Sequence, residues 1–130
     1  MGRVSYYESV NDVPANGWRW PHFRPEEFMS KGNGALMVHE QALDCLEMLR
    51  STIGQQLIIT SAYRDPLYNA RVGGAPASRH KVGDAFDIRW PDLAKANMIV
   101  LAKNCGFRGI GIYSRFLHID LGAQRQWSGV

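Results

Sequence analysis

Strict alternation of apolar and polar residues near the end of the chain limits its fold more than any other feature. In residues 116–121 (FLHIDL), the apolar positions 117, 119 and 121 share one face of an extended strand. His118 and Asp120 then lie side by side on the opposite face. Residues 85–90 (AFDIRW) alternate in the same way and place Asp87 on their polar face. The pattern predicts two strands with a core on one side and ionisable groups on the other.

The remaining periodicities complete an α+β domain. Three- and four-residue spacing of apolar positions predicts helices at residues 36–53 and 93–105, with Asp92 as N-cap and Gly106 ending the second helix. Apolar runs and alternation predict strands at residues 56–64, 83–90, 109–113 and 116–122. The stretch 65–78 contains two prolines and a glycine pair, so it predicts a loop with one helical turn near residues 67–70. We expect one domain over residues 1–130, with a small, largely antiparallel sheet flanked by two main helices.

The ends of the chain carry weaker patterns. Residues 1–34 are rich in aromatics, glycine and proline and predict an irregular segment held to the surface by its aromatic side chains. Residues 24–28 (RPEEF) favour a short helical turn within it. Residues 123–130 predict a short polar tail around one tryptophan. Cys45 and Cys105 lie in apolar helical patterns, which favours free buried thiols.

Composition limits the classes of partner. The net charge of +3 is mildly basic and comes without a block of Lys and Arg, so we expect no nucleic-acid partner. No apolar run is long enough to span a bilayer. Residues 1–17 lack the apolar stretch of a signal peptide, so we expect synthesis in the cytoplasm. We expect a monomer.

His80, Asp87 and His118 are the strongest candidates for chemistry. Gly83 permits a turn between His80 and the strand that carries Asp87, so the three side chains converge if both strands share a sheet. Two imidazoles and one carboxylate with an open position form a typical catalytic zinc site. Asp120 could instead be the carboxylate ligand, or it could orient His118 through the second ring nitrogen. The alternative without a metal is a pair of histidines satisfied by ordinary core hydrogen bonds.

The combined string Ser78-x-His80-x-x-Gly83-x-Ala85-x-Asp87 followed by His118-x-Asp120 resembles the signature of the zinc D-alanyl-D-alanine carboxypeptidase family. The segments TSAYRDPLYNARVGG and FRPEEF also resemble that family, so the likeness covers roughly residues 23–122. It implies the Hedgehog/DD-peptidase fold, one Zn²⁺ ion on His80, Asp87 and His118, and a peptidoglycan peptide as the substrate.

The resemblance further implies that Arg64 receives a substrate carboxylate, a role that suits its planar charged fork. Ser78 would steady the loop or the substrate site by hydrogen bonding, because no free histidine stands ready to activate it as a nucleophile.

One departure from the family concerns the residues just before the last histidine. Several branches carry a Glu three positions before it, or a His five positions before it, and this chain has Arg115 and Tyr113 there. Both could stabilise a developing oxyanion, and neither is a natural base at neutral pH. Proton transfer would then fall to Asp120, or to a group such as His22 or His39.

The expected function is a zinc metallopeptidase that hydrolyses an amide bond of peptidoglycan stem peptides, as a D-Ala-D-Ala carboxypeptidase or a lysin-type endopeptidase. Action on the cell wall without a signal peptide fits a phage or prophage product that reaches the wall from a virion or through a holin. The alternative is a non-catalytic zinc module that binds the wall. A non-haem iron oxygenase is disfavoured because no histidine follows His118.

Overall fold

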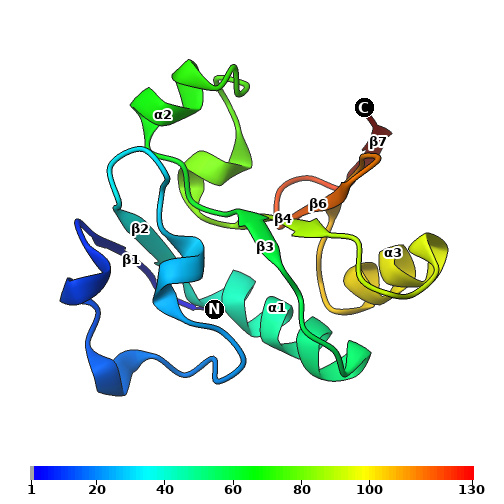
Figure 1. Cartoon of the computed structure of the whole chain (residues 1–130), viewed down its shortest axis with the longest axis horizontal. Coiled ribbons are helices and arrows are strands. Elements are labelled where there is room, and N and C mark those ends of the chain that lie inside the picture. The colour runs from blue at the N-terminus through cyan, green and yellow to red at the C-terminus, as the bar shows by residue number, and fades with distance from the viewer. Residues whose placement is uncertain (1) are drawn as a thin grey trace.

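The computed structural model describes residues 2–130 and has two sheets and three α-helices (Figure 1). The α-helices are α1 (Glu40–Ile53), α2 (Pro66–Arg71) and α3 (Lys95–Asn104). The strands are β1 (Val4–Tyr7), β2 (Leu36–His39), β3 (Ile59–Ser61), β4 (Ala85–Arg89), β5 (Gly109–Ile112), β6 (Phe116–Asp120) and β7 (Arg125–Ser128). Four 3₁₀ helices complete the chain: η1 (Val10–Asp12), η2 (Ala15–Gly17), η3 (Pro25–Phe28) and η4 (Arg79–Val82).

The larger sheet has five strands in the order β3-β4-β6-β5-β7. All neighbours are antiparallel except β5 and β7, which are parallel. The predicted α+β class and the largely antiparallel sheet are therefore confirmed.

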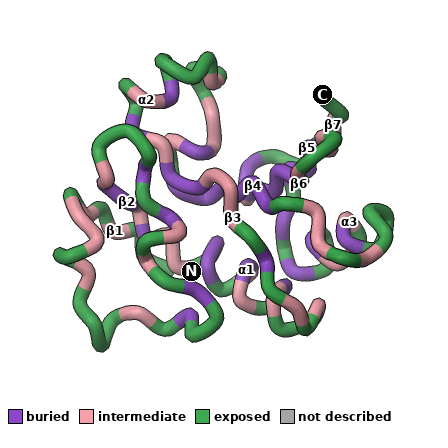
Figure 2. The backbone as a smooth tube through the Cα atoms, viewed as in Figure 1, coloured by how far each residue is buried: buried purple, intermediate pink, exposed green. Residues whose placement is uncertain are grey.

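One face of this sheet carries the core. The alternating apolar residues of β4 and β6 are almost fully buried, and Figure 2 shows buried residues along both strands. They share a core cluster with Leu46 of α1 and Met98 of α3, so the two longer helices cover the same face. The predicted alternation is confirmed, and the ionisable groups of β4 and β6 are left on the opposite face.

The predicted helix at residues 36–53 begins too early. Residues 36–39 form β2, which pairs with β1 in a separate two-stranded sheet. Val38 and Ala42 are four residues apart, which imitates a helix, but Leu36 and Val38 are both buried with the period of two of a strand. The partner strand β1 lies inside the segment predicted to be irregular, so that prediction is wrong at residues 4–7.

The N-terminal aromatics otherwise hold their segment as predicted. Trp20 and Phe23 are buried, and the indole N–H of Trp20 donates to Asp44 of α1 over 2.8 Å. Residues 25–28 form η3, which matches the predicted helical turn.

Three parts of the chain differ from the predicted elements. Asp92 does not cap α3, because its main chain is held by the Gln55 side chain through two hydrogen bonds, and the helix begins after Ala94. The C-terminal tail, for which only a short polar segment is predicted, contains a strand, since residues 125–128 form β7. The strand predicted at residues 56–64 is reduced to β3, with a register shift between Ile59 and Ser61. Along residues 2–130, no helix has the length and hydrophobicity needed to cross a bilayer.

Candidate metal centre

Three separate elements bring His80, Asp87 and His118 together. His80 lies in η4, which ends at Gly83 in the left-handed conformation with φ of 82°. The chain then enters β4, where Asp87 pairs directly with His118 of β6. One donor atom from each of the three residues lies within 4.8 Å of the other two, and all three residues are buried. The predicted convergence is confirmed.

Each imidazole is held from behind by a fixed acceptor. Nδ1 of His80 lies 2.7 Å from the main-chain carbonyl of Ala62, and Nε2 of His118 lies 2.7 Å from Oδ2 of Asp120. The opposite ring nitrogens, Nε2 of His80 and Nδ1 of His118, lie 3.2 Å and 2.9 Å from the same oxygen, Oδ1 of Asp87. Both rings therefore point their inner nitrogens at one place.

The donors and acceptors in this cluster fit a divalent cation. The outer nitrogens of His80 and His118 make the shorter contacts, each 2.7 Å to an oxygen that can only accept, so in the neutral rings these nitrogens carry the proton. The inner nitrogen of each neutral ring then carries a lone pair that points at the anionic oxygen of Asp87. The two nitrogens and this oxygen are all acceptors, with no proton between them. A zinc ion satisfies all three acceptors, and the hydrogen bonds behind the rings are those that orient metal-bound histidines.

The charge of Asp87 supports the same reading. Burial opposes its ionisation, but without a metal ion the hydrogen bonds that the inner nitrogens of His118 and His80 can donate outweigh burial and lower the pKa of Asp87 to about 2. Asp87 is therefore an anionic oxygen donor at neutral pH. Burial likewise opposes protonation of His118, while Asp120 and Asp87 raise its pKa, so a proton and a metal ion compete for its inner nitrogen.

Asp120 lies behind His118, on the side away from Asp87. It is fully buried and also accepts hydrogen bonds from Arg125 and from the main-chain N–H of Gly122. Burial opposes its ionisation, but these partners together with His118 lower the pKa of Asp120. The carboxylate thus has the place of a group that orients His118, and it does not line the cavity that opens onto the metal cluster.

A cavity of about 280 Å³ opens onto the metal cluster. Besides the cluster, Arg64 and three residues of the loop after α2 line it: Gly73, Gly74 and Ala75. Three aromatic residues in or next to β5, β6 and β7 complete the lining: Tyr113, Phe116 and Trp127. Two Nη atoms of Arg64 reach Asn69 Oδ1 at 3.3 Å and Asp87 Oδ2 at 3.8 Å. Arg64 therefore stands beside the metal cluster.

Other residues singled out in the sequence lie outside the cavity. Arg115 is exposed in the turn before β6 and does not line it. The Ser78 hydroxyl accepts a hydrogen bond from the main-chain N–H of His80 and caps η4, so it steadies the loop. His22 pairs with Glu47 at the surface, and His39 caps α1 through Nδ1. Neither histidine lines the cavity.

The sequence shows Trp127 only as the one aromatic residue of a short polar tail, and the structure places it in the cavity wall. Its ring centroid lies 5.3 Å from that of His118, and its indole N–H donates to Tyr113 Oη over 2.8 Å. The missing signal is β7, because an isolated polar tail with one tryptophan carries no strand pattern.

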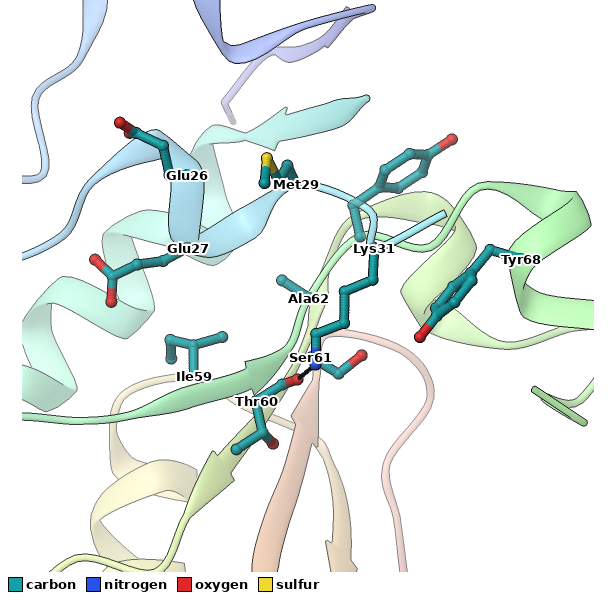
Figure 3. A pocket seen from close by; sticks show the side chains of 10 residues that line it. Glu26, Glu27, Met29, Lys31, Ile59, Thr60, Ser61, Ala62 and Tyr68 are labelled. Atoms are coloured by element: carbon teal, nitrogen blue, oxygen red, sulfur yellow. Dashed lines mark hydrogen bonds between the residues drawn. The ribbon is translucent and has the colours of Figure 1, made fainter. Parts of the chain in front are cut away.

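A second cavity lies along the outer edge of β3 (Figure 3). None of the three residues of the metal cluster lines this second cavity. Glu26 and Glu27 lie on one wall, and Lys31 reaches across to donate to the carbonyl of Thr60 over 2.5 Å. A lysine at this position protects an exposed strand edge.

A buried His-Asp-His cluster that opens to a cavity has the ligand set of a catalytic metal site with an open position. Residues 21–120 match the model of the Peptidase M15 family, and because this match covers most of the chain, the chain belongs to that family. A comparison with curated proteins returned no match. Membership confirms the resemblance seen in the sequence and the expected DD-peptidase fold. The chain is thus a metallopeptidase of a zinc-dependent family that acts on peptidoglycan-type substrates.

Proposed function

We propose that this chain hydrolyses an amide bond in the stem peptide of peptidoglycan, with His80, Asp87 and His118 as ligands of one zinc ion. The observation that carries the proposal is the shared cavity, in which the three donors and the guanidinium of Arg64 face the same space. A zinc ion held there supplies Lewis-acid chemistry, because it polarises a carbonyl oxygen and makes a coordinated water more acidic. Such an enzyme would act at the cell wall.

Arg64 selects a substrate that carries a carboxylate next to the scissile amide. Its guanidinium is mostly buried, and its contacts with Asn69 and Asp87 are long, so hydrogen-bonding capacity remains for an incoming anion. Planar bidentate pairing with a carboxylate is the recognition that arginine performs best. A terminal D-alanine and a side-chain carboxylate within the stem both meet this requirement.

Tyr113 is the residue best placed to stabilise negative charge on the substrate. Trp127 donates its indole N–H to the phenol oxygen, so the phenol O–H is free to donate elsewhere. Tyr113 lines the cavity and would donate that hydrogen bond to the oxygen of the amide as charge develops on it. Replacing Tyr113 by Phe removes this donor, together with the oxygen that accepts from Trp127, and is expected to lower kcat about 10- to 100-fold.

The second candidate function is a non-catalytic zinc module that binds the wall. Among the cavity-lining residues the only carboxylate is Asp87, which already belongs to the metal cluster. No residue of this wall therefore duplicates the basic group that several family branches place before the last histidine. If no cleavage is found, the lack of this basic group would be the structural reason to assign a binding module.

Metal analysis combined with mass spectrometry of digested peptidoglycan separates these functions. We expect about one zinc per chain and released peptide or D-alanine. Free D-alanine identifies a carboxypeptidase, and separated stems or cross-bridges identify an endopeptidase. Zinc and wall binding without any product would establish the binding module.

Two histidine variants make the ligand assignment specific. His80→Ala should lose both zinc and cleavage, since one of three ligands is gone. His22→Ala, at an exposed ring outside the cavity, should keep its full zinc content. Normal zinc content in His80→Ala would show that the ligand set is wrong.

A further inference from the structure

The strand β7 reaches the metal centre across a strand that has no side chains on that face. β5 lies between β6 and β7, and the face that it shares with the cluster carries Gly109 and Gly111. The register places Gly109 between Asp120 of β6 and Arg125 of β7. It places Gly111 between His118 and Trp127 in the same way. Side chains of β7 thus lie over the glycines and contact β6, two strands away.

Both glycines are required for this contact. A Cβ atom on Gly109 would collide with Oδ1 of Asp120 and with Nη1 of Arg125. A Cβ atom on Gly111 would lie 2.6 Å from the Trp127 ring, closer than real Cβ contacts. Gly109 and Gly111 of β5 therefore leave the space that the side chains of Arg125 and Trp127 occupy.

Arg125 holds Asp120 with both arms of its guanidinium. Nη1 donates to Oδ1 over 2.9 Å and Nη2 donates to Oδ2 over 2.7 Å. The same Oδ2 faces Nε2 of His118, and Oδ1 also accepts from the N–H of Gly122 over 2.8 Å. Bidentate pairing fixes the plane of the carboxylate, and the plane of the carboxylate fixes the direction in which His118 can donate.

Arg125 is also held in place itself. Its guanidinium carbon lies 4.9 Å from the ring centroid of Trp127, and a third hydrogen bond runs from Nη1 to the carbonyl of Ala123 over 2.9 Å. A long side chain held at three points loses little further freedom when it orients a partner. The chain of contacts Arg125–Asp120–His118 is thus fixed along its whole length.

We propose that Arg125 is a positioning residue of the metal centre, which acts through Asp120 to direct Nδ1 of His118 at the metal ion. This inference rests on the proposed zinc site. Without Arg125, Asp120 keeps only the N–H of Gly122 and the His118 ring as partners, so its plane is no longer set. Loss of such an outer partner typically weakens metal binding about 10- to 100-fold.

The experiment measures the zinc dissociation constant by competition with a chromogenic chelator. Arg125→Gln should bind zinc about 10- to 100-fold more weakly than the wild type. Arg125→Lys keeps the charge but not the planar guanidinium, so its zinc affinity should lie between those of the wild type and Arg125→Gln. Arg108→Gln, at an exposed arginine just before β5, is the matched control and should bind zinc like the wild type. The absorption spectrum of the cobalt-substituted protein should change in Arg125→Gln and stay unchanged in the control.

A double-mutant cycle tests whether Arg125 acts through Asp120. In the Asp120→Asn background, replacing Arg125 should weaken zinc binding by less than about threefold, because the carboxylate that it orients is gone. A full additive loss would overturn the proposed path, as would wild-type zinc affinity in Arg125→Gln. If Arg125→Gln does not fold, Arg125→Lys decides alone, and wild-type affinity in that variant would overturn the need for bidentate pairing. Failure of the wild type to bind zinc would instead refute the proposed function.

Discussion

The main-chain carbonyl of Ala62 accepts a hydrogen bond from Nδ1 of His80 over 2.7 Å. Ala62 directly follows β3, so the edge strand of the sheet fixes both the orientation and the tautomer of a residue in η4. A main-chain acceptor cannot be removed by a side-chain substitution. The geometry of His80 is therefore built into the backbone, while that of His118 depends on the side chains of Asp120 and Arg125.

Zinc should stabilise the folded protein. A ligand that binds only the native state adds about 2.7 kcal/mol at a free concentration of 100 times its Kd. We expect addition of zinc to chelator-treated protein to raise the thermal unfolding midpoint, with a smaller rise as pH falls because protons compete with zinc for Nδ1 of His118. Differential scanning calorimetry with and without zinc measures this shift. His118→Ala should abolish it, and an undiminished shift in that variant would contradict the assignment.

Arg64 should matter more for substrate than for folding. Charge-assisted hydrogen bonds contribute about 1.5–3 kcal/mol, so Arg64→Gln should lower kcat/KM about 10- to 100-fold. Steady-state kinetics on a stem peptide with a free carboxylate provides the measurement. Arg71→Gln, at an exposed arginine of α2, is the matched control. Equal kcat/KM in wild type and Arg64→Gln would show that Arg64 does not recognise the carboxylate.

Leu46 and Met48 of α1 test the assignment of the core face. Leu46 is fully buried, whereas Met48 is 56% exposed. Leu46→Ala removes buried methyl groups and leaves a cavity, so it should lower the free energy of unfolding by about 2–5 kcal/mol. Met48→Ala should change it by less than about 0.5 kcal/mol. Chemical denaturation measures both, and similar losses in the two variants would contradict the helix orientation.

Asp65 should make part of the stability dependent on pH. The Ser30 hydroxyl and the main-chain N–H groups of Tyr68 and Asn33 lower the pKa of this carboxylate in the folded state. The folded pKa is below that of the unfolded chain, so the contribution is complete above the unfolded pKa. It is lost as pH falls through the folded pKa.

Urea denaturation at several pH values measures the contribution of Asp65. The wild type should exceed Asp65→Asn in stability at pH 7, and the two should converge toward pH 2. Asp12→Asn, at an exposed carboxylate of η1, serves as the control. A difference that persists unchanged at low pH would show that ionisation of Asp65 is not the cause.

Period-two alternation in the sequence was sufficient to predict the polar faces of the two strands that carry Asp87 and His118. It placed His118 and Asp87 each on the polar face of its own strand, because side chains of a strand must alternate and the apolar set must be buried. The spacing of Gly83 from His80 allowed the turn that completes the cluster. These inferences are local, since each depends on residues within one strand or one turn.

Only the tertiary structure decided how the remaining parts surround that centre. The sequence pattern left both Asp87 and Asp120 as possible ligands, and the two lie on opposite sides of the His118 ring. β2 and β7 were missed because a short strand obtains its hydrogen bonds from a partner that is distant in the chain. The contact of Arg125 with Asp120 has the same origin, since it exists only because a glycine of the intervening strand leaves the space open.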